Sequence, residues 1–427
     1  MNEELKIDER PIVPLFRKLF FPIVIEQLFG MLLGSIDVLM LSQYSDASVA
    51  ATGLSNQLIN VGLMILGIAS LGSGILLMQT AGTHDQSEVS LIIRHGVDLN
   101  VIISIIMSAV FLLFGRQLLS WIQTPQELID SSYNYLAIVS VSLIFQSVMT
   151  SFGSIFRSFT YVRIVMIASI ATNILSILGN YIVLFTQITL LGSGIHGVAV
   201  STLIARFIGM IFLMLAFYHF LPDYKQAFSS WRLQGKTIRA ILDLGFPSAL
   251  ENISYTSSQT IITGIIASFG AVMVTSKIYT QNITGVIFTI AAAISQANQI
   301  IIGRYIGLKQ KDYARDYTIK LIVKSVILAF GLSLVLALIS PWIIGWLTKD
   351  TDIQKIVLQL IWISIILEPG RLSNEILIGA LNTAGDVKFP TAISIASTFL
   401  VHRSNELSYR YSLVLWTCRC LDCVHYR

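Results

Sequence analysis

Cysteine and charged residues are scarce in this chain of 427 residues. Only three cysteines occur, all within the last ten residues, so the sequence holds no disulfide framework. Charged residues make up 12% of the chain against 54% hydrophobic residues, and the mean hydropathy is +0.74. Soluble globular domains carry about 25% charged residues. The composition therefore excludes an ordinary soluble protein and predicts an all-α polytopic membrane protein.

Motifs for nucleotide, metal and covalent chemistry are also missing. No Gly-x-x-x-x-Gly-Lys segment supports ATP as a direct energy source, and the six histidines are scattered without metal-ligand spacing. The segment Gly192-x-Gly194-x-x-Gly197 has the spacing of a dinucleotide-binding loop, but it follows an apolar span and no Asp or Glu occurs in 198–222. We expect a tight turn there, no cofactor and no enzymatic activity.

The chain repeats itself after about 225 residues. Phe21-Pro22-x-x-x-Glu26 recurs as Phe246-Pro247-x-x-x-Glu251, and both copies place a glutamate inside an apolar stretch. A carboxylate in hydrocarbon is costly, so such residues are functional candidates by default. Duplicated membrane halves are a common architecture of secondary transporters. The repeat therefore favours transport over other membrane functions.

Apolar runs long enough to cross a bilayer, about 20 residues each, recur along both copies. They lie near 16–41, 52–79, 95–115, 133–155, 163–187, 195–220, 239–267, 273–301, 317–346 and 353–380, and an eleventh begins near Phe389. These runs predict two homologous six-helix bundles. The expected units are a leader at 1–14, an N-terminal bundle at 15–220, a connector at 221–238, an incomplete C-terminal bundle at 239–400 and an atypical tail at 401–427.

The tail from about Val401 differs in composition from everything before it. It is rich in arginine, with histidine and cysteine interspersed, where the repeat partner of 175–220 should continue as apolar helix. We hypothesise that a frameshift or a misread coding sequence produced it and that the last span and a half are missing. Cys420-x-x-Cys423 resembles a metal or redox pair, but no other cysteine accompanies it outside this tail.

Lysine and arginine are unevenly distributed among the loops. Most of those outside the spans lie in the leader through Lys18 and in every second loop after it, above all in the connector. Cytoplasmic loops hold the excess of positive residues. The N-terminus is therefore expected in the cytoplasm, and the net charge of +4 is a topology signal that argues against nucleic-acid binding. A bacterial plasma (inner) membrane fits this pattern.

Two acids lie in the first span. Glu26 and Asp37 are 11 residues apart, close to three helical turns, so they share one face about 16 Å apart. Removal from water disfavours the charged form of a carboxyl group, and a nearby cation favours it. A group balanced between these states can exchange H⁺ or Na⁺ for a cationic substrate. The alternative is structural: neutral acids satisfied by neighbouring hydroxyl or amide groups.

The second copy adds more polar groups within its spans. Glu251 is followed by a run of hydroxyl and amide residues, and Gln281 lies in the next span. Such a polar density must line water or another helix, so we expect a wet pocket, with Na⁺ near Glu251 or Asp37 as one reading. In the tenth span Glu368 and Arg371 stand i,i+3 and can pair. That pair is either structural or part of ion coupling.

These segments together resemble the multidrug and toxic compound extrusion (MATE) family, over residues 10 to about 400. The matching pieces are Pro22-x-x-x-Glu26-Gln27, Gly34-x-x-Asp37, Asn173 with Asn180, Gly197-Val198-Ala199-Val200-Ser201-Thr202, Pro247-x-x-x-Glu251-Asn252, Glu368-Pro369-x-Arg371-x-x-Asn374 and Gly379-Ala380-Leu381. The specificity of the match lies in their combined order and spacing.

The resemblance implies two six-helix bundles facing a central cavity, alternating access, and export of organic cations driven by H⁺ or Na⁺. It implies a role in coupling for Asp37, while Asn180 stands where some members carry an acid. The expected partners are small organic cations and the lipid bilayer, and the chain is expected to be a monomer. Two alternatives remain: a flippase for a lipid-linked oligosaccharide, which would need several cationic cavity residues, and a non-functional truncated product.

Overall fold

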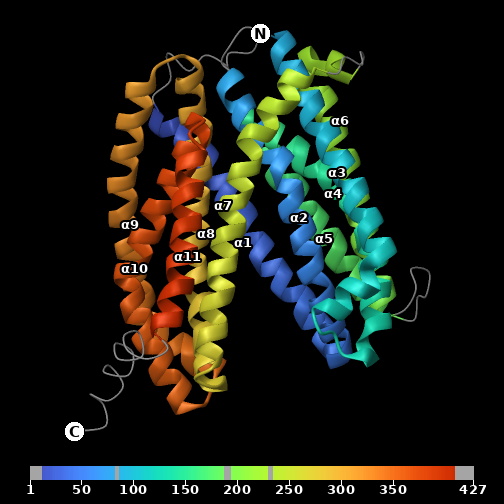
Figure 1. Ribbon diagram of the computed structural model, residues 1–427, viewed down its shortest axis with the longest axis vertical. Helices are drawn as coiled ribbons and strands as arrows, with labels where there is room; N and C mark the ends of the chain where they lie inside the picture. The colour runs from blue at the N-terminus through green and yellow to red at the C-terminus, as the bar shows by residue number, and fades with distance from the viewer. Residues whose placement is uncertain (1–11, 82–85, 187–193, 229–233, 409–427) are drawn as a thin grey trace.

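The computed structural model describes residues 12–81, 86–186, 194–228 and 234–408. Within these residues it is all-helical, and its long helices run side by side along the long axis (Figure 1). The elements are α1 (Ile12–Tyr44), α2 (Asp46–Thr80), α3 (Gln86–Trp121), α4 (Gln126–Ser158), α5 (Val162–Phe185), α6 (Gly194–Phe220), the 3₁₀ helix η2 (Pro222–Phe228), α7 (Gly235–Ala267), α8 (Ala271–Gly307), α9 (Lys311–Leu347), α10 (Thr351–Ala384) and α11 (Lys388–Ser408).

Each predicted span corresponds to one of these helices, which confirms the predicted all-α polytopic fold. The helices extend past the apolar runs, as in α3, which begins nine residues before the run at 95–115, because hydropathy marks only the part that hydrocarbon can cover. Among the described residues, α1–α6 and α8–α10 are long and apolar enough to cross a membrane. The polar run after Glu251 lowers the hydropathy of α7.

The expected unit boundaries shift slightly. Helix α1 already begins at Ile12 and α7 at Gly235, inside the predicted leader and connector. The connector also contains η2. Helix α11 continues to Ser408, beyond the predicted boundary at 400. The hypothesis about the rest of the tail concerns residues 409–427, which lie outside the described residues, as do Gly192 of the predicted turn and the cysteines.

The helix contacts confirm the internal repeat. In the first half α1 packs on α5, α2 on α4 and α3 on α4; in the second half the equivalent pairs are α7 with α11, α8 with α10 and α9 with α10. Between the halves, α2 packs on α7 and α1 packs on α8, so each half offers the same two helices to the other. Figure 1 shows α1 running obliquely between the two groups. The two halves are therefore related as two copies of one unit.

The α2–α7 crossing depends on glycine. A Cβ atom on Gly72 would meet the backbone carbonyl oxygen of Ile241, and a Cβ atom on Gly245 would meet that of Ile68. Small residues let helix backbones approach closely in membranes. At the equivalent α1–α8 crossing, side chains such as Leu19 fill the contact instead. The halves thus touch backbone to backbone at one crossing and through side chains at the other.

One end of the interface also has a polar link. Gln79 Nε2 of α2 donates to the carbonyl oxygen of Thr383 in α10 at 2.6 Å. Gly385 caps the end of α10. Its φ of +90 favours glycine, and its N–H donates a hydrogen bond to the carbonyl oxygen of Asn382 at 3.0 Å. The first half therefore contacts the second where α2 and α10 both end.

Candidate functional site

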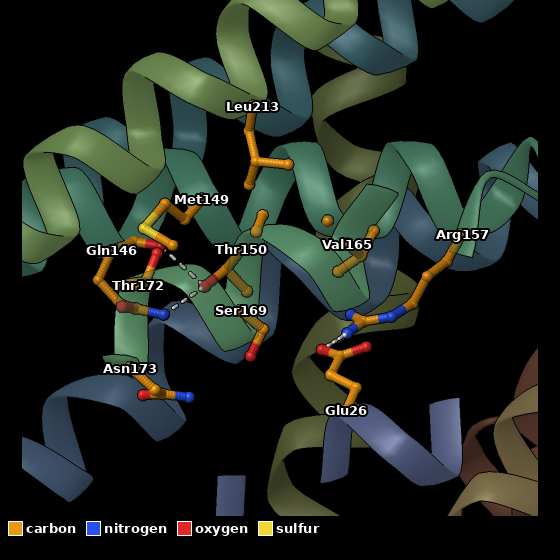
Figure 2. A pocket seen from close by; sticks show the side chains of 12 residues that line it. Glu26, Gln146, Met149, Thr150, Arg157, Val165, Ser169, Thr172, Asn173 and Leu213 are labelled. Carbon is orange, nitrogen blue, oxygen red and sulfur yellow. Dashed lines mark hydrogen bonds and ion pairs between the residues drawn. The ribbon is translucent and has the colours of Figure 1, made fainter. Parts of the chain in front are cut away.

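The first half holds a cavity of about 300 Å³ between α1, α4, α5 and α6. Figure 2 shows Glu26 and Arg157 at one side of it, and Gln146, Thr172 and Asn173 at the other. Its lining combines one acid and one base with amides, hydroxyls and the apolar side chains Met149, Val165, Ala168 and Leu213. The cavity has the size and mixed chemistry of a small-molecule site.

The charged side of the cavity is an ion pair between α1 and α4. Arg157 Nη2 lies 2.6 Å from Glu26 Oε1, and the side chains are 22% and 12% exposed. The second carboxylate oxygen of Glu26 is buried and has no hydrogen-bond partner. The positive charge of Arg157 offsets the negative charge of Glu26, so Glu26 has its counter-ion within the protein. This ion pair is neither a free coupling acid nor the expected structural alternative of a neutral acid satisfied by hydroxyl or amide groups.

Sequence reasoning missed Arg157 as a partner of Glu26. The residue was counted with the basic loop residues because it follows the apolar run at 133–155. The structure places it in the last turn of α4, one residue before the helix ends at Ser158. The only signal of Arg157 in the sequence is that it is the single arginine of an apolar and hydroxyl-rich helix. Because charges in membrane spans tend to pair with each other, such an arginine indicates an acidic partner.

The opposite side of the cavity carries Asn173, which was predicted as a site residue. Asn173 and Thr172 reach the cavity from α5, and Thr150 and Gln146 reach it from α4. The Thr150 hydroxyl donates to the Gln146 carbonyl at 2.8 Å. Half-buried amides and hydroxyls of this kind can orient polar groups of a ligand. The structure thus brings Glu26 and Asn173 to one cavity, although neither Gln146 nor Thr150 was predicted.

Asp37 belongs to a second polar cluster, further along α1. Asn180 Nδ2 donates to Asp37 Oδ1 at 3.0 Å, and Asn180 is buried on α5. Tyr135 of α4 interacts electrostatically with both Asp37 and Arg206, and the Arg206 guanidinium donates to the Ser142 hydroxyl at 2.8 Å. The structure therefore pairs the two predicted residues Asp37 and Asn180. No ion pair involving Asp37 occurs among the described residues.

In the second half Arg371 is the centre of a cluster between α7, α8 and α10. Arg371 Nη1 lies 3.7 Å from Oε1 of the buried Glu368. Arg371 Nη2 donates a hydrogen bond to the Tyr255 hydroxyl oxygen at 2.8 Å. Its guanidinium carbon lies 3.9 Å from the ring centroid of Phe288, a cation–π contact. The predicted i,i+3 ion pair is confirmed. Phe288 was missed, because only the fold brings α8 to α10.

Two further acids face the same cluster. Glu251 of α7 and Glu375 of α10 interact electrostatically, and Glu375 also interacts with Arg371. Glu368 and Glu375 thus share one guanidinium, and Glu251 lies beside them as a third carboxylate. If all were ionised, an excess of negative charge would remain in a half-buried site. A bound cation or protons would offset that excess.

The remaining predicted residues lie apart from these contacts. Gln281 of α8 and Asn374 of α10 are exposed and take part in none of the hydrogen bonds of the described clusters. No group of three or more His, Cys, Asp or Glu suited to a metal ion occurs within residues 12–408 as described. The roles of all nine predicted residues in coupling, and a Na⁺ site near Glu251 or Asp37, stay predictions.

Comparison with known proteins identifies the family. The MatE family model matches residues 22–182 and 247–404, one match in each half. The uncharacterized transporter YisQ of Bacillus subtilis is 36% identical over 379 residues, which cover 89% of this chain and 83% of YisQ. The probable multidrug resistance protein NorM of Thermotoga maritima is 24% identical over 383 residues, covering 89% and 82%.

The fold is similar as well. A crystal structure of a point mutant of a MATE protein superposes with a TM-score of 0.84 over 97% of this chain and 92% of the other, at 15% identity. The likeness shows a shared arrangement of helices. Together with the match of the family model over both halves, it confirms the resemblance found in the motifs. The chain belongs to the MatE family of membrane transporters.

Proposed function

We propose that this transporter is a cation-coupled antiporter that exports small organic cations by alternating access, with H⁺ or Na⁺ moving in the opposite direction. The observation that carries the proposal is the excess of carboxylates in the second half: Glu368 and Glu375 interact with the single guanidinium of Arg371, and Glu251 interacts with Glu375. A site with surplus negative charge binds either a proton, a metal cation or an organic cation. Competition between them is what an antiporter requires.

Within that cluster the carboxylates divide into two kinds. Glu368 is buried against Arg371, which Tyr255 and Phe288 also hold in place. Glu251 stands opposite Glu375 with no guanidinium of its own, so the charged forms of this pair repel each other. We assign the exchange of substrate and coupling ion to Glu251 and Glu375. Glu368 and Arg371 then fix the position of α10 relative to α7.

In the first half we assign coupling to Asp37 and structure to Glu26. The amide of Asn180 holds Asp37 through one hydrogen bond, which a protonated or an ionised carboxyl can accept. Glu26 already has Arg157 as a counter-ion. The adjoining cavity of about 300 Å³ would take the polar part of a substrate on Asn173, Thr150 and Gln146.

The proposed setting is a bacterial plasma membrane with the N-terminus in the cytoplasm. The α8–α9 turn and η2, which carry basic residues, lie at the same end of the molecule as the start of α1 in Figure 1. The positive-inside rule assigns that end to the cytoplasm.

A flippase for lipid-linked sugars is less well supported. It needs free cationic groups to hold a pyrophosphate. Arg157 and Arg371 are each paired with a glutamate, and Arg206 is directed to Ser142. These three guanidinium groups are thus engaged by the protein itself.

Transport by the full chain in proteoliposomes tests the assignment. Export of a fluorescent organic cation is measured against an imposed pH gradient without Na⁺, and separately against a Na⁺ gradient at constant pH. Glu251→Gln removes the titrating group and should reduce gradient-driven export by at least about 10²-fold, as loss of a proton-transfer group does. The matched control is Glu127→Gln, an exposed acid at the start of α4, which should transport like the unmodified chain.

The two gradients separate the coupling ions, since only the one used will drive export. Export by Glu251→Gln at an unchanged rate and pH dependence would contradict the role of Glu251. Failure of the unmodified chain to export any cation under either gradient would contradict the antiporter and favour the non-functional alternative.

A further inference from the structure

Arg206 is a charged residue within a membrane span that the proposed transport cycle does not use. It lies near the middle of α6, and its side chain is half-buried. Its guanidinium donates a hydrogen bond to the Ser142 hydroxyl at 2.8 Å, and it forms no ion pair with another described residue. A charge at this depth in a bilayer is costly, and a neutral hydroxyl does not balance it. Arg206 therefore needs an acid as its counter-charge.

The other charges of the first half leave one acid for this role. About two turns or more from either helix end, the spans α1–α6 hold three acids: Glu26, Asp37 and Asp98. Two of them have an arginine of their own, at 2.6 Å from Glu26 and at 3.2 Å from Asp98. Asp37 accepts a hydrogen bond from the neutral amide of Asn180 at 3.0 Å and has no such arginine among the described residues. Asp37 is therefore the acid left to balance Arg206.

Tyr135 of α4 brings the two charges into relation. It is buried and interacts electrostatically with both Asp37 and Arg206. It belongs to one apolar cluster with Leu41, one turn after Asp37 on α1, and with Val198 of α6. The serine that accepts from Arg206 lies two turns after Tyr135, on the same face of α4. The helices α1, α4 and α6 thus meet around Tyr135, and both charges act on this one side chain.

We propose that Arg206 is the fixed counter-charge of Asp37 and sets how tightly the first half holds its coupling cation. While Asp37 is ionised, the two charges balance each other. When Asp37 takes up a proton or another cation, the charge of Arg206 is left unbalanced within the membrane, so the cation leaves more readily than it would from an isolated carboxylate. Arg206 is a positioning residue in this scheme, because it acts through Asp37. The inference rests on the coupling role proposed above for Asp37.

Infrared titration of the full chain in detergent without Na⁺ tests the proposal. The carbonyl stretch of protonated Asp37 is identified by its loss in Asp37→Asn, and its pH midpoint is measured in each variant. Arg206→Gln should shift the midpoint upward by on the order of one pH unit, as loss of a unit charge about 10 Å away does at the effective dielectric constant of a protein. Arg206→Lys keeps the charge and should titrate like the unmodified chain. The matched control Arg163→Gln removes an exposed arginine at the start of α5 and should leave the midpoint unchanged.

Two further variants separate the charge of Arg206 from its hydrogen bond. Ser142→Ala removes the hydrogen bond and keeps the charge, so its midpoint should stay near that of the unmodified chain. If Arg206→Gln does not fold, the double variant Asp37→Asn/Arg206→Gln should fold, because it leaves neither charge unbalanced. An unshifted midpoint in Arg206→Gln, an equal shift in Ser142→Ala, or a double variant as unstable as Arg206→Gln would overturn the proposal. The titration needs no transport, so a failure of export would contradict the proposed antiport and leave these midpoints interpretable.

Discussion

At the scale of residues, the acids of the two halves differ in what neutralises them. Glu26 has its own arginine at 2.6 Å, whereas Glu375 shares Arg371 with Glu368 and Glu251 interacts with Glu375. A neighbouring cation favours the ionised form of a carboxyl group, whereas a neighbouring carboxylate disfavours it. The equivalent positions Glu26 and Glu251 of the repeat have thus diverged in environment, although their local sequences are alike.

The Glu26–Arg157 pair gives a stability prediction. Arg157→Met should destabilise the protein by about 3 kcal/mol, because removing one partner of a buried pair leaves an uncompensated charge. The double variant Glu26→Gln/Arg157→Met should recover most of that loss. The measurement is the apparent melting temperature in detergent.

Its control is the exposed pair of Arg116 with Asp130, at 3.0 Å. Arg116→Met should change stability by less than about 1 kcal/mol, as exposed pairs do. If the double variant Glu26→Gln/Arg157→Met were as unstable as Arg157→Met alone, the uncompensated charge of Glu26 would not be the cause of the destabilisation.

At the scale of elements, the sequence predicted which segments are helical and which faces are polar, but not which helices meet. Glu368 and Arg371 were predicted as a pair because both lie on one helix, where i,i+3 spacing fixes their distance. Glu26 and Arg157 are 131 residues apart, and hydropathy says nothing about which span faces which. Asn180 and Asp37 were each selected, yet their hydrogen bond depends on α1 lying against α5.

The α2–α7 crossing gives a prediction at this scale. Gly245→Ala adds a methyl group against the backbone carbonyl of Ile68, and strain of this kind costs about 1–3 kcal/mol. The matched control is Gly264→Ala on the same helix, where an added Cβ meets nothing within 4 Å; it should be neutral or stabilising. The apparent melting temperatures of the two variants are compared in detergent. Equal melting temperatures would contradict a backbone contact at the crossing.

At the scale of the whole molecule, two copies of one unit meet through equivalent helices. The repeat in the sequence predicted the copies, but the exchange of contacts between α1–α8 and α2–α7 was visible only in the fold. Gln79 of α2 and the Thr383 carbonyl of α10 join the halves at one end. In alternating access such a contact must open in one of the two states.

That requirement yields a cross-linking prediction. In a background without Cys418, Cys420 and Cys423, the pair Gln79→Cys/Thr383→Cys joined by a short bifunctional thiol reagent should stop export, and cleavage of the linker should restore it. The control pair Arg116→Cys/Asp130→Cys lies within the first half at 3.0 Å between the original side chains, and its cross-link should leave export intact. Unimpaired export with the first pair fully cross-linked would contradict relative motion of the halves at this end.

The glycines of the α2–α7 crossing also fix how two rigid halves can move. Where two backbones touch without side chains between them, sliding drives carbonyl groups into the opposing chain, so rotation about the contact is the less costly movement. Such a contact would act as the pivot between the two halves. On either side of a pivot the two halves move in opposite directions, so a cavity that widens at one membrane face would narrow at the other. Gly72 and Gly245 would then determine how far each half moves on either side of the crossing, although neither glycine is among the residues proposed to bind the substrate.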